Sequence, residues 1–187
     1  MAAPNEIDIS DVSGRWSLNR GLSDSLESCF ALQGIPWIVR KVINFASLEL
    51  QYRKDIPPDD AVAAPSFAFK QTVRPGGFDT SNRYIIDGKS RTDTVPIFGE
   101  ITMHARYLNR DEVTAEQTWK WGVEGDAAEN VAILEVVESK NMGWKAETLW
   151  IFETINGEYR FCKYNIITKG EDRATAKMVH DYIGPAN

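Results

Sequence analysis

The residues of this chain that could carry chemistry do not form the usual catalytic sites. Its two histidines, His104 and His180, lie far apart in the sequence, unlike the ligands of a zinc site. Pro75-Gly76-Gly77 predicts a turn rather than a phosphate-binding loop, because no helical pattern follows it. The chain has no Gly-x-Ser-x-Gly motif. We therefore expect no metal and no cofactor, and the sequence argues against hydrolytic, redox and phosphoryl-transfer reactions that need such motifs.

Polar residues spaced among aromatic ones remain in the last third of the chain. Lys163, His180 and Tyr159 are the candidate catalytic groups, because each carries a group that can donate a hydrogen bond to a ligand oxygen. Lys163 is costly to bury unless it meets water, an acid or a ligand oxygen. For Lys163 and His180, a structural role without chemistry is the alternative.

A predicted hairpin at Asn156-Gly157 positions these residues. Asn-Gly between two alternating runs indicates a two-residue type I′ turn, which fixes the register of strands 144–155 and 159–168. The same register predicts an ion pair between Glu153 and Arg160. The other expected pairs are Ile155 with Glu158, Phe152 with Phe161, Trp150 with Lys163 and Thr148 with Asn165.

The two faces of this hairpin differ in character. One face mixes aromatic and polar groups, which suits the lining of a ligand cavity, although a plain hydrophobic core is the alternative. It carries Trp150, Phe152, Thr154, Tyr159, Phe161, Lys163 and Asn165. Glu147 and Glu153 fall on the opposite face, so they do not serve as paired catalytic carboxylates there.

Short strand patterns recur along the rest of the chain and are separated by turn residues. This spacing predicts an all-β antiparallel meander, hence a sandwich or an up-and-down barrel. Two helices are expected within residues 22–46, with Ser23 and Asp24 as caps and Pro36 opening the second. Residues 1–11 are expected to form a loose leader. Further strands are predicted at 13–19, 48–53, 67–73, 84–86, 101–107, 119–121, 131–137 and 174–182.

Composition limits the partners and the compartment. The 187 residues suit a single domain over residues 1–187, and the net charge of −6 disfavours nucleic acid and anionic membranes as partners. The two cysteines, Cys29 and Cys162, are expected to be reduced and buried. Without a signal peptide or a long apolar run, we expect a cytoplasmic protein. The oligomeric state is not indicated.

Several of these segments resemble the calycins, which include lipocalins and fatty-acid-binding proteins. The resemblance lies in Val12-Ser13-Gly14-Arg15-Trp16-Ser17-Leu18, Leu32-Gln33-Gly34-Ile35, Arg40-Lys41 and the hairpin Ile155-Asn156-Gly157. It implies a single antiparallel up-and-down barrel with an N-terminal helix–turn–helix lid. It also implies that Trp16 plugs the closed end. Trp37 on the lid is alternatively part of an interaction surface.

The resemblance has a consequence for the ligand. Phe152 occupies the position of an inward-facing arginine of fatty-acid-binding proteins. If the last turn has an even length, Met178 and His180 occupy the positions of the Arg-x-Tyr that binds the carboxylate; an odd length would turn Lys177 inward instead. A buried carboxylate needs a paired charge, and Lys163 is the remaining candidate. The resemblance therefore implies a bulkier, mostly neutral ligand rather than a fatty acid.

The whole chain also resembles lipocalin-like proteins of fungal natural-product pathways, some of which are cofactor-free pericyclases, including Diels–Alderases and hetero-Diels–Alderases. That resemblance implies cyclisation of an aromatic, terpenoid or polyketide intermediate. Such a reaction needs two π systems held in proximity and a few hydrogen-bond donors. The expected substrate-binding residues are Tyr52, Phe67, Phe69, Gln71, Tyr84, Met103, Tyr107, Trp119, Trp121, Trp150, Phe152, Phe161, Asn165 and Met178.

Two other functions stay open at this point. A carrier that sequesters a lipophilic metabolite needs the same hollow interior but shows no turnover. A protein-interaction module predicts an interior filled by side chains. The cyclase and carrier hypotheses both require a hollow barrel with Trp150, Phe152 and Phe161 on its inner wall.

Overall fold

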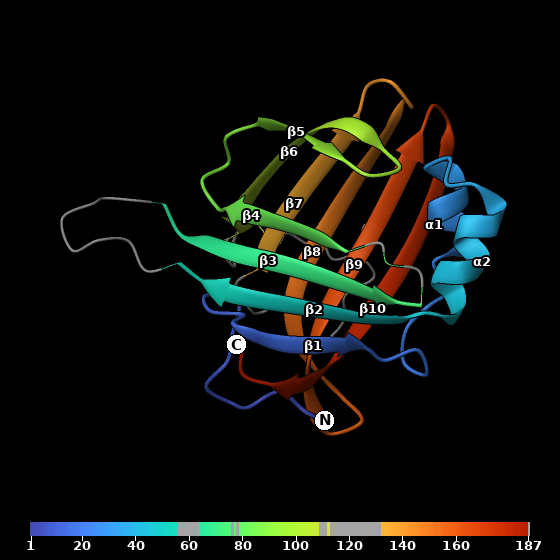
Figure 1. Ribbon diagram of the computed structural model, residues 1–187. Helices are drawn as coiled ribbons and strands as arrows, with labels where there is room; N and C mark the ends of the chain where they lie inside the picture. The colour runs from blue at the N-terminus through green and yellow to red at the C-terminus, as the bar shows by residue number, and fades with distance from the viewer. Residues whose placement is uncertain (56–63, 76, 78, 109–111, 113–131, 187) are drawn as a thin grey trace.

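In the part of the chain that the structure describes, ten antiparallel strands form one sheet that curls into a nearly closed barrel (Figure 1). This is a computed structural model, and it describes residues 1–55, 64–75, 77, 79–108, 112 and 132–186. Within these residues the strands are β1 (Gly14–Leu18), β2 (Ser47–Lys54), β3 (Ser66–Arg74), β4 (Thr80–Ile85), β5 (Arg91–Val95), β6 (Gly99–Leu108), β7 (Ala132–Ser139), β8 (Trp144–Ile155), β9 (Glu158–Lys169) and β10 (Asp172–Gly184). The predicted all-β antiparallel barrel is confirmed.

The strand order shows how the barrel closes. Along the sheet it is β4-β3-β2-β1-β10-β9-β8-β7-β6-β5, so the first strand pairs with the last. An isolated parallel bridge joins Ile86, just after β4, to Ala105 on β6. Figure 1 shows β1 to β4 crossing in front of β7 to β10, and the interior lies between these two groups of strands.

The Asn156-Gly157 hairpin has the predicted geometry. Both turn residues have positive φ, 53° and 80°, as a type I′ turn requires. The pairs predicted for β8 and β9 are all present. The next turn pairs Lys169 with Asp172 and so contains two residues, which is the even length that places Met178 and His180 on the same face as Lys163.

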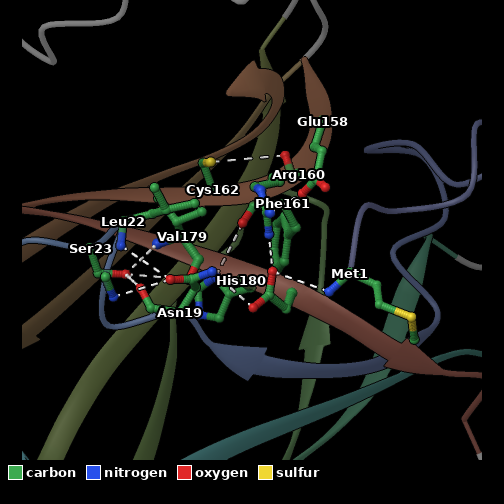
Figure 2. Close-up of polar contacts among 12 residues, drawn as sticks. Met1, Asn19, Leu22, Ser23, Glu158, Arg160, Phe161, Cys162, Val179 and His180 are labelled. Carbon is green, nitrogen blue, oxygen red and sulfur yellow. Dashed lines mark hydrogen bonds and ion pairs between the residues drawn. The ribbon is translucent and has the colours of Figure 1, made fainter. Parts of the chain in front are cut away.

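The ion pair predicted between Glu153 and Arg160 is wrong, although the two residues lie opposite each other. Arg160 instead pairs with Glu158 and with Asp181 on β10 (Figure 2). Glu153 pairs with Lys177, with 2.6 Å between its Oε1 and the ammonium nitrogen. The hairpin pattern alone does not reveal these partners, because β10 lies beside β9 and brings its own charges to the same face.

The two predicted helices form the lid, α1 (Glu27–Leu32) and α2 (Trp37–Phe45). They are joined by Arg40, whose Nε donates to Glu27 at 2.8 Å. α1 begins later than expected, because Ser23 and Asp24 do not cap it. Their side chains accept hydrogen bonds from the backbone N–H groups of Val179 and Lys177, and so continue the edge of β10 beyond β1. The Ser23 contact is visible in Figure 2.

Residues 1–11 do not extend as a loose leader. The Ala3 N–H donates to the carbonyl of Tyr159 at 2.7 Å, and the Tyr182 N–H donates to that of Met1 at 3.0 Å. Ala3 and Ile9 are buried in the same cluster as the barrel aromatics. The segment therefore packs on the end of the barrel opposite the lid, where the β8–β9 turn lies.

Candidate functional site

The interior of the barrel has two halves that differ in the size of their side chains. On the side facing the lid, Trp144 at the start of β8 packs against Phe98, and the inward positions beyond it on β8 and on β10 carry small residues, Ala146, Thr148, Ala174 and Ala176. On the far side, β8 and β9 carry large rings. These far-side residues are Trp150, Phe152, Phe161 and, on β1, Trp16, all at most 1% exposed.

The far half is solid. The ring centroid of Trp16 lies 5.8 Å from that of Phe152 and 5.3 Å from that of Phe161, and Phe152 stacks on Phe161 at 5.3 Å. These are the spacings of packed aromatic pairs. The expectation of a hollow barrel with Trp150, Phe152 and Phe161 lining its inner wall is therefore wrong for this half. Trp150, Phe152 and Phe161 point inward as predicted, but they fill the space between the sheets.

The inward-facing side chains of the lid half are less deeply buried than the far-side rings. Cys29 of α1 packs with Ala146, Ile167 and Ala176 beside the lid. Between this cluster and the far-side rings, inward-facing residues are partly exposed: Phe69, Gln71, Asn165 and Met178, all predicted substrate-binding positions. We call the region that these residues border the lid-side chamber.

Lys163 forms the floor of this chamber, and its side chain crosses the interior. Its Nζ donates to the Tyr52 hydroxyl of β2 at 2.8 Å and lies 3.7 Å from the ring centroid of Trp150. Burial lowers the pKa of Lys163 to about 8, against the opposing effect of the Glu135 charge. A lysine with a lowered pKa among aromatic rings is the most perturbed candidate group facing the chamber.

Glu135 is the acid beside this lysine, and the sequence analysis missed it. Its Oε2 accepts a 2.8 Å hydrogen bond from the indole N–H of Trp150, and the side chain is 7% exposed. Tyr84 also hydrogen-bonds Glu135. Burial first, and then the Glu135 charge, raise the pKa of Tyr52 and Tyr84 well above 10, so both phenols stay neutral. The alternation of Ile133, Glu135 and Val137 along the strand could have predicted that this carboxylate faces inward.

His180 lies below the floor, fully buried. Its Nδ1 lies 3.3 Å from the carbonyl oxygen of Phe161, the contact drawn in Figure 2. A carbonyl accepts, so Nδ1 carries the proton in that hydrogen bond and Nε2, which has no partner, is an acceptor. Burial, and then the charge of Lys163, lower the pKa of His180 to about 3. The ring is neutral and presents an acceptor, rather than the expected donor.

Tyr159 lies apart from Lys163, at the far end of the barrel. Its ring stacks on Phe152 at 5.0 Å, and burial raises its pKa. It borders an open groove of about 460 Å³ that is also lined by Ala2, Ala3, Asn5, Thr154, Gly157 and Glu158. The structure therefore brings Lys163 near Tyr52 and His180, but it does not bring Tyr159 into this group.

The remaining predicted residues are spread around the interior. Phe67 is fully buried, and Tyr84 packs between the rings of Phe69 and Trp150. Met103 borders a cavity of only about 10 Å³ between β4 and β6. Tyr107 is half-buried near the leader, where burial and then the charge of Asp8 raise its pKa. Trp119 and Trp121 lie outside the described residues.

The described residues contain neither a metal-binding cluster nor a candidate membrane-spanning helix. No three or more His, Cys, Asp or Glu side chains in this part of the chain are grouped so that they could hold a metal ion. No helix there is long and apolar enough to cross a membrane.

Comparison with known proteins gives two kinds of similarity. No family model matches the chain. "Probable pericyclase scpY" of Mollisia scopiformis is 25% identical over 98% of this chain and 96% of its own length. "Pericyclase pydY" of Acremonium sp is 24% identical over 99% of this chain and 98% of its own length. The resemblance to pericyclases noted from the sequence thus extends over nearly the whole chain.

Solved structures agree with the barrel. Caenorhabditis elegans lipid binding protein 8 superimposes with a TM-score of 0.56 at 13% identity, covering 92% of this chain and 95% of that chain. Human cRBP IV gives 0.54 at 12%, covering 92% and 98%. A Schistosoma mansoni fatty acid binding protein in complex with arachidonic acid gives 0.53 at 10%, covering 91% and 95%.

The chain has the fold of a calycin-like barrel. Both the predicted fold and the predicted resemblance are confirmed by these comparisons. At this level of identity the solved structures show the fold of the calycin-like barrel and leave its ligand to be argued from its own residues.

Proposed function

We propose that this calycin-like barrel binds a small hydrophobic intermediate in the lid-side chamber and accelerates a cofactor-free pericyclic cyclisation of the Diels–Alder or hetero-Diels–Alder type. The observation that carries the proposal is the similarity to two proteins named pericyclases over 98% and 99% of the chain. The substrate class we propose is a reactive enone or quinone methide joined to an alkene, within a polyketide or terpenoid skeleton.

The geometry of the chamber supports this chemistry. A cycloaddition gains several kcal/mol when the two π systems are held together in the reactive orientation. Phe69, which is partly exposed, offers an aromatic surface for that purpose. Lys163 is placed to donate a hydrogen bond to the carbonyl oxygen, where negative charge increases in the transition state. Asn165 and Gln71 add polar groups on the wall.

The interior argues against a fatty acid as the substrate. Phe152, Met178 and His180 lie inward at the positions where the fatty-acid-binding proteins carry carboxylate-binding groups. None of the three carries a positive charge, since His180 is neutral. A neutral oxygenated molecule needs a single donor such as Lys163, whereas a carboxylate needs a fully paired charge.

Carriage without turnover is the second candidate function. It is supported by the fold itself, because the superimposed proteins include lipid-binding and fatty-acid-binding ones. Both functions use the same chamber, so binding alone does not separate them.

A kinetic experiment separates the two functions. The purified protein is incubated with a quinone methide generated in situ and an electron-rich alkene, and the product is analysed by chiral chromatography. The proposed function predicts a rate above the spontaneous reaction and an excess of one stereoisomer. Lys163→Met should depress the rate by about 100- to 1000-fold, as expected for loss of an oxyanion donor. Lys177→Met, which changes an outward-facing lysine, is the matched control. Tight binding with the spontaneous rate and a racemic product would establish the carrier instead.

A further inference from the structure

We propose that Lys163 forms a reversible iminium bond with an α,β-unsaturated aldehyde or ketone that enters the lid-side chamber. The inference rests on the proposed function for its substrate class and adds a covalent step to it. The surroundings of the Lys163 amine differ from those of Lys177 on the neighbouring strand β10.

The amine of Lys163 is held by a phenol and by aromatic faces. Its Nζ donates to Tyr52 at 2.8 Å and lies 3.7 Å from the ring centroid of Trp150 and 5.8 Å from that of Phe161. Lys177, in contrast, is paired directly with the Glu153 carboxylate at 2.6 Å. Buried charges are normally paired, as Lys177 is, whereas among the described residues no carboxylate lies within ion-pair distance of Lys163.

Such surroundings make a nucleophilic amine. A lysine desolvated among apolar groups releases its proton readily, and the neutral amine is the form that attacks carbonyl carbons. With a pKa of about 8, roughly 20% of Lys163 is neutral at pH 7.4. For Lys177 the pKa is raised instead, by the hydrogen bonds to Glu153 and Tyr164 acting against burial, so its amine stays protonated.

The titratable groups around Lys163 come from four other strands. They are Tyr52 on β2, Tyr84 on β4, Glu135 on β7 and His180 on β10. Both phenols and the imidazole are neutral, so Glu135 is the charged group among them that acts on the amine.

The step balances without another reactant. The neutral amine adds to the carbonyl carbon, so a C–N bond forms, the C=O π bond breaks and a proton moves from nitrogen to oxygen. The hydroxyl takes up a second proton and leaves as water, while the nitrogen lone pair forms the C=N bond. That second proton is the one Lys163 released to solvent on becoming neutral, so no other reactant is needed. After cyclisation, water adds back and frees the product and the amine.

An iminium at this place suits both the site and the reaction. It withdraws electrons from the conjugated alkene more strongly than a carbonyl does, which favours addition of an electron-rich partner. Its positive charge would remain over the Trp150 ring that already holds the ammonium, an arrangement stabilised by cation–π attraction.

Reductive trapping tests the inference on the whole protein. Wild-type protein is incubated with cinnamaldehyde and sodium cyanoborohydride at pH 7.5, digested and mapped by mass spectrometry. We expect a gain equal to the aldehyde mass less one oxygen atom on Lys163, at least about 10-fold above the gain on Lys177, given the difference in neutral amine. Lys163→Arg keeps a charge and donors and should abolish this adduct, whereas Lys177→Arg should leave it unchanged.

The outcomes separate this inference from the proposed function. Labelling spread evenly over the lysines, or a Lys163→Arg protein with a native circular dichroism spectrum and the wild-type cyclisation rate, overturns the covalent step while cyclisation by wild type still stands. An adduct on Lys163 in a protein that shows no cyclisation supports the covalent site and defeats the proposed function. Because the mapping is done on wild type, a variant that fails to fold does not affect it.

Discussion

The two halves of the barrel interior are built on the same strands but differ in how tightly their side chains fill the space. Along β8, the inward residues change from Ala146 and Thr148 beside the lid to Trp150 and Phe152 at the far end. Where the side chains are large they meet across the barrel and exclude solvent. Where they are small or polar, neighbouring inward side chains such as Asn165 and Met178 stay partly exposed. Side-chain size, on one backbone architecture, therefore decides which part of the barrel interior is sealed from solvent.

The boundary between the halves is where charge is concentrated. Lys163 and Glu135 lie at the level of Trp150, between the packed rings and the chamber. Buried charges are weak evidence for a stabilising role, since apolar replacements of the same size are often as stable. This placement connects the packing of the barrel to its proposed chemistry, because the solid half provides a rigid floor for the reactive groups.

The largest effect should come from emptying the solid half. Trp16→Ala removes a fully buried ring that contacts Phe152, Phe161 and Tyr182. It should lower the free energy of unfolding by about 3–5 kcal/mol. Met178→Ala, at the chamber wall, should cost clearly less, because that side chain is already partly exposed. Urea denaturation of both variants measures the difference, and equal losses would contradict the division into two halves.

The next effect concerns acid stability. His180 has a pKa of about 3 in the folded protein against 6.5 for the ordinary imidazole. Between these values the unfolded chain binds the additional proton, so stability falls as pH decreases from 6.5 toward 3, with a slope of up to about 1.4 kcal/mol per pH unit. His180→Leu should remove this contribution.

Chemical denaturation at several pH values between 3 and 7 gives both slopes. Carboxylates such as Asp79, which is paired with Arg74, add their own acid dependence to wild type and variant alike. The difference between the two curves therefore isolates His180. Parallel curves would show that the imidazole is not held neutral.

The smallest effect in free energy should come from filling the chamber. Met178→Trp places a large ring beside Lys163, its partner on β9, and should lower turnover at least about 10-fold by occupying the ligand's space. Met178→Leu keeps the volume and serves as the control. The cyclisation rates of the two variants are compared, and their melting temperatures show whether both are folded. A folded Met178→Trp protein that cyclises at the wild-type rate would show that the ligand does not occupy the space beside Met178.

Local patterns predicted much of this arrangement. The Asn156-Gly157 turn fixed the register of β8 and β9, and through it the inward position of Lys163. The even turn at Gly170-Glu171 extended that register to His180 on β10. Both inferences work because side chains alternate strictly along a strand, so one fixed turn determines many orientations.

Contacts between distant segments were not predictable in this way. Arg160 forms an ion pair with Asp181 on β10, and Ala3 in the N-terminal segment hydrogen-bonds to Tyr159. No short sequence pattern encodes these pairings. Whether the inward rings would line a hollow or fill it depends on how closely the opposed strands approach, which is a property of the closed barrel. The alternation along β7 was enough to predict that Glu135 faces inward. An isolated acid in an apolar run, however, gives no indication of its hydrogen-bond partners.

A crystal structure with the cyclised product bound would locate the binding site. We expect product density in the lid-side chamber, between Phe69, Asn165 and Met178, with the product oxygen within hydrogen-bonding distance of the Lys163 nitrogen. Product bound instead in the groove beside Tyr159, with the chamber unoccupied, would overturn the proposed site.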